Sequence, residues 1–585
     1  MRAETPPTSF APDESATLTM PAGQRAHRDM IAHLPQFERR MHVVCDGVWV
    51  LVGNGLSNQC FVRGPEGLIA IDTGECVEEM RSALASLREY TSEPVVAVIY
   101  THFHYVSGTR AIFDAGGDPA MPIWAHSLVE ANRLRVAGET SVVASRGLVE
   151  QFGLGLPADG PDGLVGVGLG TSYRNPDHAP YTPGYVTPNH CFDAPTRARI
   201  AGLDVVMTPA PSDADDSITI WFPALGLCVN NLVWPSLFNI FPIRGEAFRD
   251  PRVLLEGIDH ILGLAPEHLV TAHGLPISSR ERVREIATDS RDAIQFLWDQ
   301  TVRLMNQGFS GPEIAMRVRL PARFSSHCHT RELYGLAEHY VRQIQCGLVG
   351  WYDGEIARLF PLPPTQRARR LIAGFGGIDT VLSQARAALD AGDLRWALEL
   401  ASWLVRDAIG DGPAEAVMPD SADEPARKTL AAALRAIAVR TTAANIRNWC
   451  LTHARALEGT LDLSRFYVHR FRAADVLEGP AHAHVHVLRV LLDPVRAEGV
   501  DGELRWAFDS GEQTGLRLRG QVAVPTDGQG ADIEIRLSRQ TWAQMLAGRL
   551  RLDQALSSGA ITTDDAAAVR RWLSCFEHRA FEPGH

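Results

Sequence analysis

The chain has few cysteines for its length, and no two of them are spaced as a metal or redox motif. Nine cysteines are scattered over 585 residues, which predicts reduced thiols in a cytoplasmic protein rather than a disulfide framework. No apolar run approaches the roughly 20 residues that a membrane-spanning helix needs. The amino terminus lacks the basic and apolar regions of a secretory signal, and we expect residues 1–25 to form a disordered leader.

Positive charge is also in deficit, with a net charge of -13 and an isoelectric point near 5.9. This balance predicts no binding to nucleic acid or to an anionic membrane surface. A hydrophobic content of 45% and a mean hydropathy of -0.07 indicate a globular protein. Its length suggests roughly three or four domains. An anionic substrate would need a local basic group against the acidic background.

Two histidines separated by one residue form the most informative motif. His102 and His104 follow the apolar run 94–99, a pattern typical of a buried strand. Where the strand gives way to a loop, this spacing can turn both imidazoles toward one cation, which suits zinc or iron. The chain then passes from Tyr105 directly to Val106, Ser107 and Gly108.

Periodicity divides the chain into three regions. Residues 26–283 are rich in predicted strands, glycine and proline, with a helical stretch at 75–90. Residues 284–455 have helical periodicity and short connectors. Residues 465–585 return to alternating patterns, including 531–537 and the histidine-containing stretch 484–488, which we expect to be strands of a small α+β domain.

Residues 100–110 resemble the THxHxDH signature of the metallo-β-lactamase superfamily. Blocks at 350–354, 359–364, 391–397, 449–452 and 546–561 extend the resemblance, and nearly the whole chain is similar to the alkyl sulfatase family. The resemblance implies an α/β (αββα) metallo-β-lactamase sandwich over 26–283. It also implies a helical dimerisation domain over 284–455, a sterol-carrier-protein-like α+β domain over 465–585, and a homodimer.

The sequence departs from the family pattern at the positions that bind metal in relatives. The Asp-His pair that would hold a second metal is absent after His104. Asp213 stands where relatives have a metal-binding Glu, while Asp215 and Asp216 are interpreted as loop-capping residues. Asn231 replaces a bridging carboxylate, and a neutral amide bridges two cations poorly. The resemblance therefore implies a degenerate site with one metal position kept and one lost.

The retained positions define the candidate site. By the resemblance, the metal ligands are His102, His104 and Asp213, with His273 from the last histidine loop as a fourth candidate. Asn239 and Arg244 occupy positions that lie near the sulfate in relatives, so they are the candidate substrate-binding residues. The cofactor expected is one divalent metal, zinc or alternatively iron.

Three functions remain open at this point. The first is a metal-dependent hydrolase of alkyl-sulfatase type, acting on an ester with an anionic head group and an apolar tail. The second is a non-hydrolytic, iron-dependent or biosynthetic metalloenzyme built on the same scaffold. The third is a pseudoenzyme that binds lipids or a partner. The sequence assigns no residue as the catalytic group.

Overall fold

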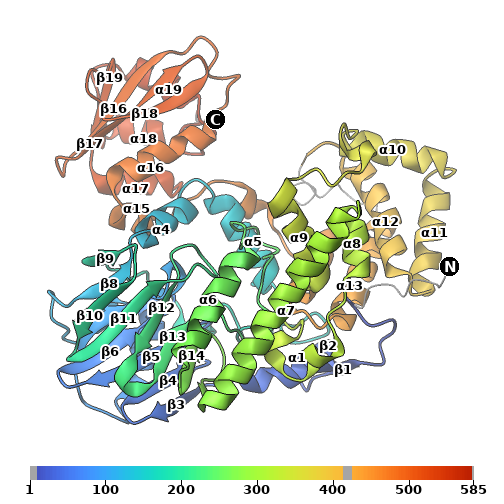
Figure 1. Cartoon of the computed structure of the whole chain (residues 1–585). Coiled ribbons are helices and arrows are strands. Elements are labelled where there is room, and N and C mark those ends of the chain that lie inside the picture. Colours follow the sequence, from blue (N-terminus) through green and yellow to red (C-terminus); the bar gives the residue numbers. More distant parts are fainter. Residues whose placement is uncertain (1–8, 413–423, 583–585) are drawn as a thin grey trace. The chain divides into compact units, whose positions relative to one another are not determined.

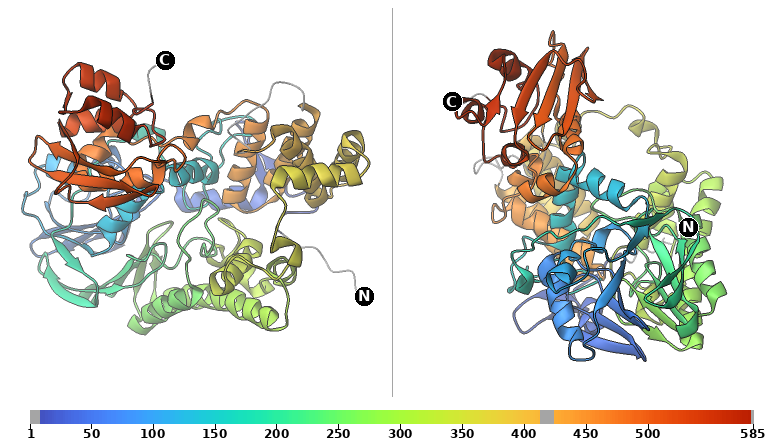
Figure 2. Two further views of the ribbon diagram at one scale, coloured as in Figure 1. Left: turned by 90° about the horizontal axis from the view of Figure 1, so that it is seen from above. Right: turned by 90° about the vertical axis from the view of Figure 1, so that its left-hand side faces the viewer.

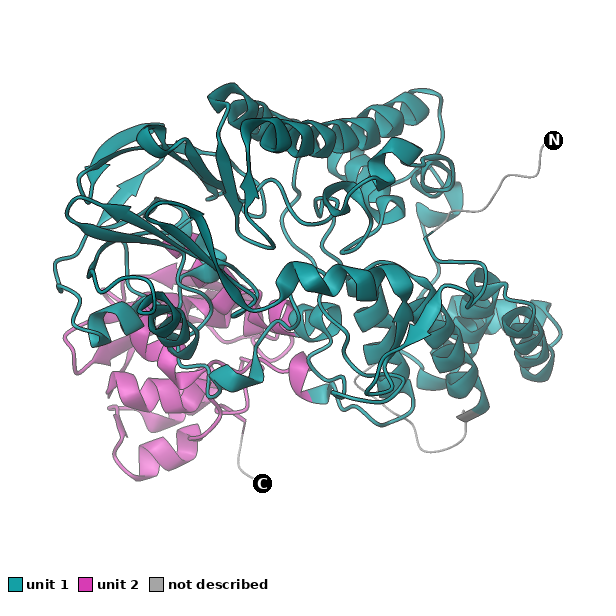
Figure 3. Cartoon of the chain, turned by 90° about the horizontal axis from the view of Figure 1, so that it is seen from below, with its two compact units in different colours: residues 1–129, 146–464 teal, residues 130–145, 465–585 magenta. Residues whose placement is uncertain are grey.

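The computed structural model describes residues 9–412 and 424–582, which fall into two compact units. The first unit contains residues up to Val129 and the stretch Arg146–Ser464. The second contains Glu130–Ser145 and the chain from Arg465 onward (Figure 3). Within the described ranges, no helix has the length and apolar character needed to cross a membrane.

Two β-sheets form the first half of unit 1 (Figure 1). The seven-stranded sheet has the order β3 (Arg40–Cys45), β4 (Val48–Val52), β5 (Gln59–Gly64), β6 (Gly67–Ile71), β7 (Val95–Ile99), β8 (Ile123–His126), β9 (His190–Phe192). The six-stranded sheet has the order β10 (Thr196–Ile200), β11 (Leu203–Pro209), β12 (Ile218–Phe222), β13 (Leu227–Asn230), β14 (His268–Thr271), β15 (Ile277–Ser278).

The two sheets enclose one apolar core. Alternate residues of β4, among them Val50 and Val52, share this core with Ile71 of the same sheet and with Ile220 and Val229 of the other. Strands buried on both faces read as continuous apolar runs, and helices cover the outer faces. The helices are α2 (Val77–Leu87) and α3 (Arg110–Asp114) for the first sheet, and α6 (Pro251–Leu264) and α7 (Arg280–Asn306) for the second. The predicted αββα sandwich is confirmed.

The helical region belongs to the same compact unit as the sandwich. The predicted boundary at 283 falls in the first turn of α7, the long green helix of Figures 1 and 2, whose Ile294 and Leu297 pack in one core with Ile258 of α6. A cut there would expose that shared core. The remaining helices of the region are α8 (Gly311–Arg317), α9 (Ala337–Val349), α10 (Pro364–Gly374), α11 (Ile378–Asp390), α12 (Leu394–Ile409), α13 (Glu424–Arg440) and α14 (Ala444–Leu457).

The expected disordered leader is wrong for its described part. β1 (Thr17–Thr19) and β2 (Arg25–His27) form a two-stranded sheet followed by α1 (Arg28–His33). The Thr17 hydroxyl donates to the Val439 carbonyl at 2.9 Å, and buried Arg447 donates to the Arg25 carbonyl. Contacts more than 400 residues away in the chain hold this segment, and no local pattern reveals them. Residues 1–8 lie outside the described range.

Unit 2 is built on a five-stranded sheet with the order β18 (Val522–Thr526), β17 (Gln513–Arg519), β16 (Gly502–Phe508), β19 (Ile533–Leu537), β20 (Ile561–Thr562). Its helices are α4 (Val129–Ala137), α15 (Ala473–Glu478), α16 (Ala481–His486), α17 (Arg539–Leu546), α18 (Leu552–Ser557) and α19 (Ala566–Leu573); α5 (Ser141–Phe152) runs from this unit into the first. Trp506, Trp542 and Trp572 fill its core.

The strand expected at 484–488 is instead helix α16 followed by a 3-10 turn over Val487–Leu491. Pro480 precedes the first helical residue, where its fixed φ and missing N–H cost nothing. Ala481 and Ala483 then favour the helix. The ring of His484 is buried while His482 and His486 contact each other across one turn. These histidines therefore do not share a single strand face.

Candidate metal site

The site lies where four strands end. β6 and β7 run parallel, as do β13 and β14, so their carboxyl ends meet at corresponding edges of the two sheets. Asp72 follows β6 and His102 follows β7, while Asn231 and His273 follow β13 and β14. Polar residues at strand ends can thus converge on one point although each strand itself is apolar.

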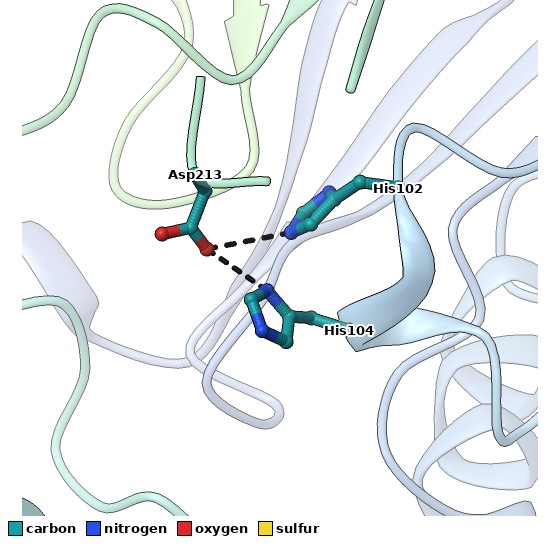
Figure 4. Close-up of side chains that lie close together, drawn as sticks. All are labelled: His102, His104 and Asp213. Carbon is teal, nitrogen blue, oxygen red and sulfur yellow. Dashed lines mark ion pairs between the residues drawn. The ribbon is translucent and has the colours of Figure 1, made fainter. Parts of the chain in front are cut away.

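Three side chains come together there (Figure 4). Oδ2 of Asp213 lies 2.9 Å from Nδ1 of His104 and 3.5 Å from Nε2 of His102. The three ligand atoms all lie within 4.8 Å of one another, and His102 and Asp213 are buried. The structure thus brings together the two motif histidines and the aspartate that takes the family's Glu position.

A buried relay orients the ring of His102. The Thr101 hydroxyl donates to Oδ2 of Asp72 at 2.6 Å and lies 2.8 Å from Nδ1 of His102. Since the hydroxyl proton is directed to Asp72, Nδ1 of the neutral ring carries a proton and donates to the hydroxyl oxygen. The lone pair of Nε2 then faces Asp213. Partners of this kind fix the tautomer and orientation of metal-binding histidines.

Arg249 is the residue of the site that the sequence interpretation missed. Its guanidinium pairs with Oδ1 of Asp213, and its Nε and Nη1 donate to the carbonyls of Asp213 and Asn239 at 3.2 and 2.7 Å. Burial opposes ionisation of Asp213, but Arg249 and then His104 hold its pKa well below the usual range. The only sign of Arg249 in the sequence was its position five residues after Arg244.

Arg244, the arginine that the sequence analysis predicted for the site, is already paired. Nη1 of Arg244 forms an ion pair with Glu246, and Oε1 of Glu246 lies 3.9 Å from Nε2 of His104. Burial alone would lower the pKa of His104, but the charges and hydrogen bonds of Asp213 and Glu246 outweigh it and raise that pKa to about 9. Arg244 therefore lies beside the three-residue cluster, in a strongly charged surrounding.

Asn239 is buried and held on both sides. Its side-chain oxygen accepts a hydrogen bond from the Tyr340 hydroxyl at 3.1 Å, and its carbonyl accepts from Arg249.

Asp216 does not act as a loop cap, because both of its carboxyl oxygens are buried without a hydrogen-bond partner. Asp216 is a second acidic group beside the histidines that the sequence interpretation did not assign to the site.

His273 is not part of the three-residue cluster. Its Nδ1 donates to the Leu56 carbonyl at 2.9 Å, so its Nε2 accepts from the Tyr105 hydroxyl at 3.3 Å. Burial lowers the pKa of His273 to about 4, which keeps the ring neutral. The rings of Tyr105 and Trp234 contact its edges. Tyr105, the residue after His104, thus engages the lone pair of His273 Nε2, which a second cation would need.

Asn231 also presents a donor to the site. The Trp234 indole N–H donates to Oδ1 of Asn231 at 2.8 Å, which directs the amide nitrogen toward Nε2 of His102 at 3.4 Å. A group that bridges two cations must donate a lone pair to each of them, as a carboxylate does. The amide offers no lone pair on this side, so it does not bridge two cations, and its long contact with Nε2 of His102 must give way when that nitrogen binds a metal.

The donor set fits a divalent metal. Two imidazole nitrogens and one carboxylate oxygen are ligands that zinc and iron both accept, with positions left for water or substrate. The lone pair of His102 Nε2 faces the Asp213 oxygen, an arrangement that a cation between them would stabilise. Nδ1 of His104 is buried and makes no other hydrogen bond. These observations favour ligation by the three residues.

Half-buried Glu75 and buried Glu79 predict a pH dependence of stability. Oε1 and Oε2 of Glu79 accept from Gln59 and from the Glu75 backbone N–H. Burial, followed by the charge of Glu79, raises the pKa of Glu75 to about 8, and burial raises the pKa of Glu79 to about 7. Because the folded state keeps these protons while the unfolded state releases them near its lower pKa, stability present at pH 4.5 is lost as the pH rises through 8.

The substitution Glu75→Gln should flatten this dependence. We expect the variant to gain roughly 1–3 kcal/mol over the parent between pH 5 and pH 9, since each pKa unit corresponds to about 1.4 kcal/mol. Chemical denaturation at several pH values measures it. Glu89→Gln, an exposed position in the same region, is the control, and an equal pH dependence in Glu75→Gln and the parent would contradict the prediction.

Comparisons with known proteins agree with the fold. The family described as metallo-beta-lactamase superfamily matches residues 52–138, that described as alkyl sulfatase dimerisation matches 310–460, and that described as alkyl sulfatase C-terminal matches 476–582. The third match covers the region predicted to be sterol-carrier-protein-like and identifies it as the carboxy-terminal domain found in alkyl sulfatases.

Whole-length relatives carry related names. A linear primary-alkylsulfatase of Pseudomonas sp. is 31% identical over 88% of this chain and 98% of its own length. An alkyl/aryl-sulfatase of Saccharomyces cerevisiae is 28% identical over 88% of this chain and 79% of its own. The solved structure of a stereoselective inverting sec-alkylsulfatase from Pseudomonas sp. superposes with a TM-score of 0.80 at 25% identity, covering 98% of this chain and 93% of that one.

Proposed function

Because this chain belongs to the alkyl sulfatase family of the metallo-β-lactamase superfamily, we propose that it hydrolyses an ester with an anionic head group and an apolar tail through a single-metal site. Its relatives are named as alkylsulfatases, so a sulfate ester is the first substrate class to test. The convergence of one potential ligand atom each from His102, His104 and Asp213, all within 4.8 Å of one another, carries the proposal.

Each residue of the site has a separate role in this proposal. Nε2 of His102, Nδ1 of His104 and Oδ2 of Asp213 would hold the metal, which when bound supplies Lewis acidity. Arg249 keeps Asp213 ionised and fixed, and Thr101 keeps His102 in the tautomer that offers Nε2. Arg244 would provide a planar, always charged contact to the oxygens of the head group.

Asn239 is proposed as a neutral contact beside Arg244. Its position is fixed by Tyr340 and by Arg249, so any hydrogen bond to substrate would come from a group that needs no reorganisation. The apolar tail is proposed to lie toward the helical region.

Elemental analysis joined to a hydrolysis assay tests the proposal. Purified protein should contain near one zinc or iron per chain and should release sulfate from a medium-chain alkyl sulfate. A chelator should abolish the release, and the metal should restore it. Bound iron with oxygen consumption and no sulfate release would instead support the non-hydrolytic enzyme. Apolar-ligand binding with no metal after loading would support the pseudoenzyme.

The metal count is tested separately by His273→Gln. We expect this variant to keep the metal content of the parent within about a tenth of an ion, because the lone pair of His273 is engaged by Tyr105 and its ring lies outside the cluster. Loss of the metal, or a parent content near two ions per chain, would contradict the single-site proposal. Thermal melting of the variant checks that it remains folded.

A homodimer is proposed on the match to a dimerisation domain and on an exposed apolar arm. In the segment between α9 and α10, Trp351, Ile356 and Phe360 are 70%, 82% and 88% exposed. An apolar patch of this kind on a soluble chain marks an interaction surface, and it lies within the matched range 310–460.

The double substitution Ile356→Glu and Phe360→Glu should therefore convert the dimer to a monomer at micromolar concentration. Two charges placed in an apolar interface must lose their hydration or hold the surfaces apart. Sedimentation velocity measures the result. Val495→Glu, 78% exposed in unit 2, is the matched control and should leave the mass unchanged. A dimer that survives the double substitution would place the interface elsewhere.

A further inference from the structure

The side chain of Arg244 is neutralised by a neighbour only two positions along the chain. Glu246 forms an ion pair with Nη1 of Arg244, and the two side chains are 12% and 13% exposed. Nε of Arg244 is buried and makes no hydrogen bond. The guanidinium therefore has one face engaged by the protein and at least one donor without a partner.

The Glu246 carboxylate also faces the metal cluster. Its Oε1 lies 3.9 Å from Nε2 of His104, on the ring edge opposite the nitrogen that faces Asp213. An oxyanion bound to Arg244 and directed toward the metal ligands would need the region that this carboxylate occupies. A carboxylate and a sulfate also have the same preference for the fork of donors on a guanidinium.

We propose that Glu246 is a specificity-determining residue that acts as an internal competitor for the anion subsite of Arg244. A sulfate head group binds only when it displaces the Glu246 carboxylate from the guanidinium. The inference rests on the proposed function, because it takes Arg244 as the anion contact. Its consequence is that inorganic sulfate, the dianionic product of hydrolysis, is repelled by the Glu246 carboxylate more strongly than a monoanionic sulfate ester, so it binds weakly and leaves the site readily. Discrimination through a repulsive element of the binding site is a general route to specificity.

Titration calorimetry of the protein as purified, with inorganic sulfate as the probe, tests the inference. Glu246→Gln keeps the size of the side chain and removes its charge, so we expect sulfate to bind about tenfold more tightly than to the parent. Glu285→Gln makes the same change of net charge in an exposed ion pair with Arg282 and should leave the affinity unchanged. Glu246→Asp, which retains the charge, should bind sulfate no more than about threefold better than the parent.

The substitution Arg244→Gln distinguishes the inference from the proposed function. In the double variant with Glu246→Gln, the tenfold gain should disappear, because the guanidinium that sulfate would use is gone. An equal gain with and without Arg244 would mean that Glu246 acts only through its general field, and would overturn the inference. No gain in Glu246→Gln, with a loss on removing Arg244, would overturn the inference alone. Affinity that never depends on Arg244 would overturn the anion subsite of the proposed function as well.

Discussion

Replacing both His102 and His104 with alanine is expected to reduce the metal content from near one ion per chain to near zero and to abolish hydrolysis. The two rings contribute two of the three clustered ligand atoms. Asp213 alone would be left, already engaged by Arg249. Loss of partners outside the ligand set typically costs 10–100-fold in metal affinity or activity, so we expect removal of two ligands to lower activity at least about 100-fold.

Elemental analysis after dialysis, beside an assay of sulfate release, measures both effects. His126→Ala is the matched control, because His126 ends β8 at the same sheet edge but lies outside the cluster. It should retain the metal and the activity. A double variant that keeps its metal would show that the ion binds elsewhere. A parent protein that takes up no metal even after loading would refute the metalloenzyme.

Replacing Arg249 with methionine is expected to lower the free energy of unfolding of the metal-free protein by about 3–5 kcal/mol. Arg249 pairs with Asp213, and the two side chains are only 3% and 5% exposed. Removal of one partner leaves the other charge buried and uncompensated, which is far more costly than the pair is stabilising. His104 offsets part of this cost, since it also pairs with Asp213.

Urea unfolding of metal-free protein measures the change. Arg252→Met, at an exposed position in the same segment, should change the free energy of unfolding by less than about 0.5 kcal/mol. The double variant Arg249→Met and Asp213→Asn should recover most of the loss, because no unpaired carboxylate remains. An equal loss in the single and double variants would indicate that Arg249 acts through its carbonyl contacts rather than through Asp213.

The positions of the candidate ligands were readable from the sequence because each lies in a short segment with its own signature. An apolar strand followed by two histidines indicates that both rings lie together at the end of that strand. Asp213 was placed by the residues around it, which match the family pattern. The structure brings these three residues together. The roles of Arg249 and the tautomer of His102 were not readable, because they depend on Asp213 and Asp72, which other segments supply. Glu246 lies two residues after Arg244, but its approach to His104 depends on the fold.

The sequence by itself determined a strand-rich first region and a helical region after it, because periodicity is carried by local residues. Its motifs also carried the resemblance that implied the family, the αββα sandwich and the loss of the Asp-His pair. Only the tertiary structure decided that Tyr105 engages His273, that residues 17–27 form a hairpin, and that the sandwich and the helices share one core. The physical reason is that each of these features is made or held by contacts between segments far apart in the chain, such as those of the hairpin with Val439 and Arg447. The energy of such a contact depends on burial and geometry that no local pattern records.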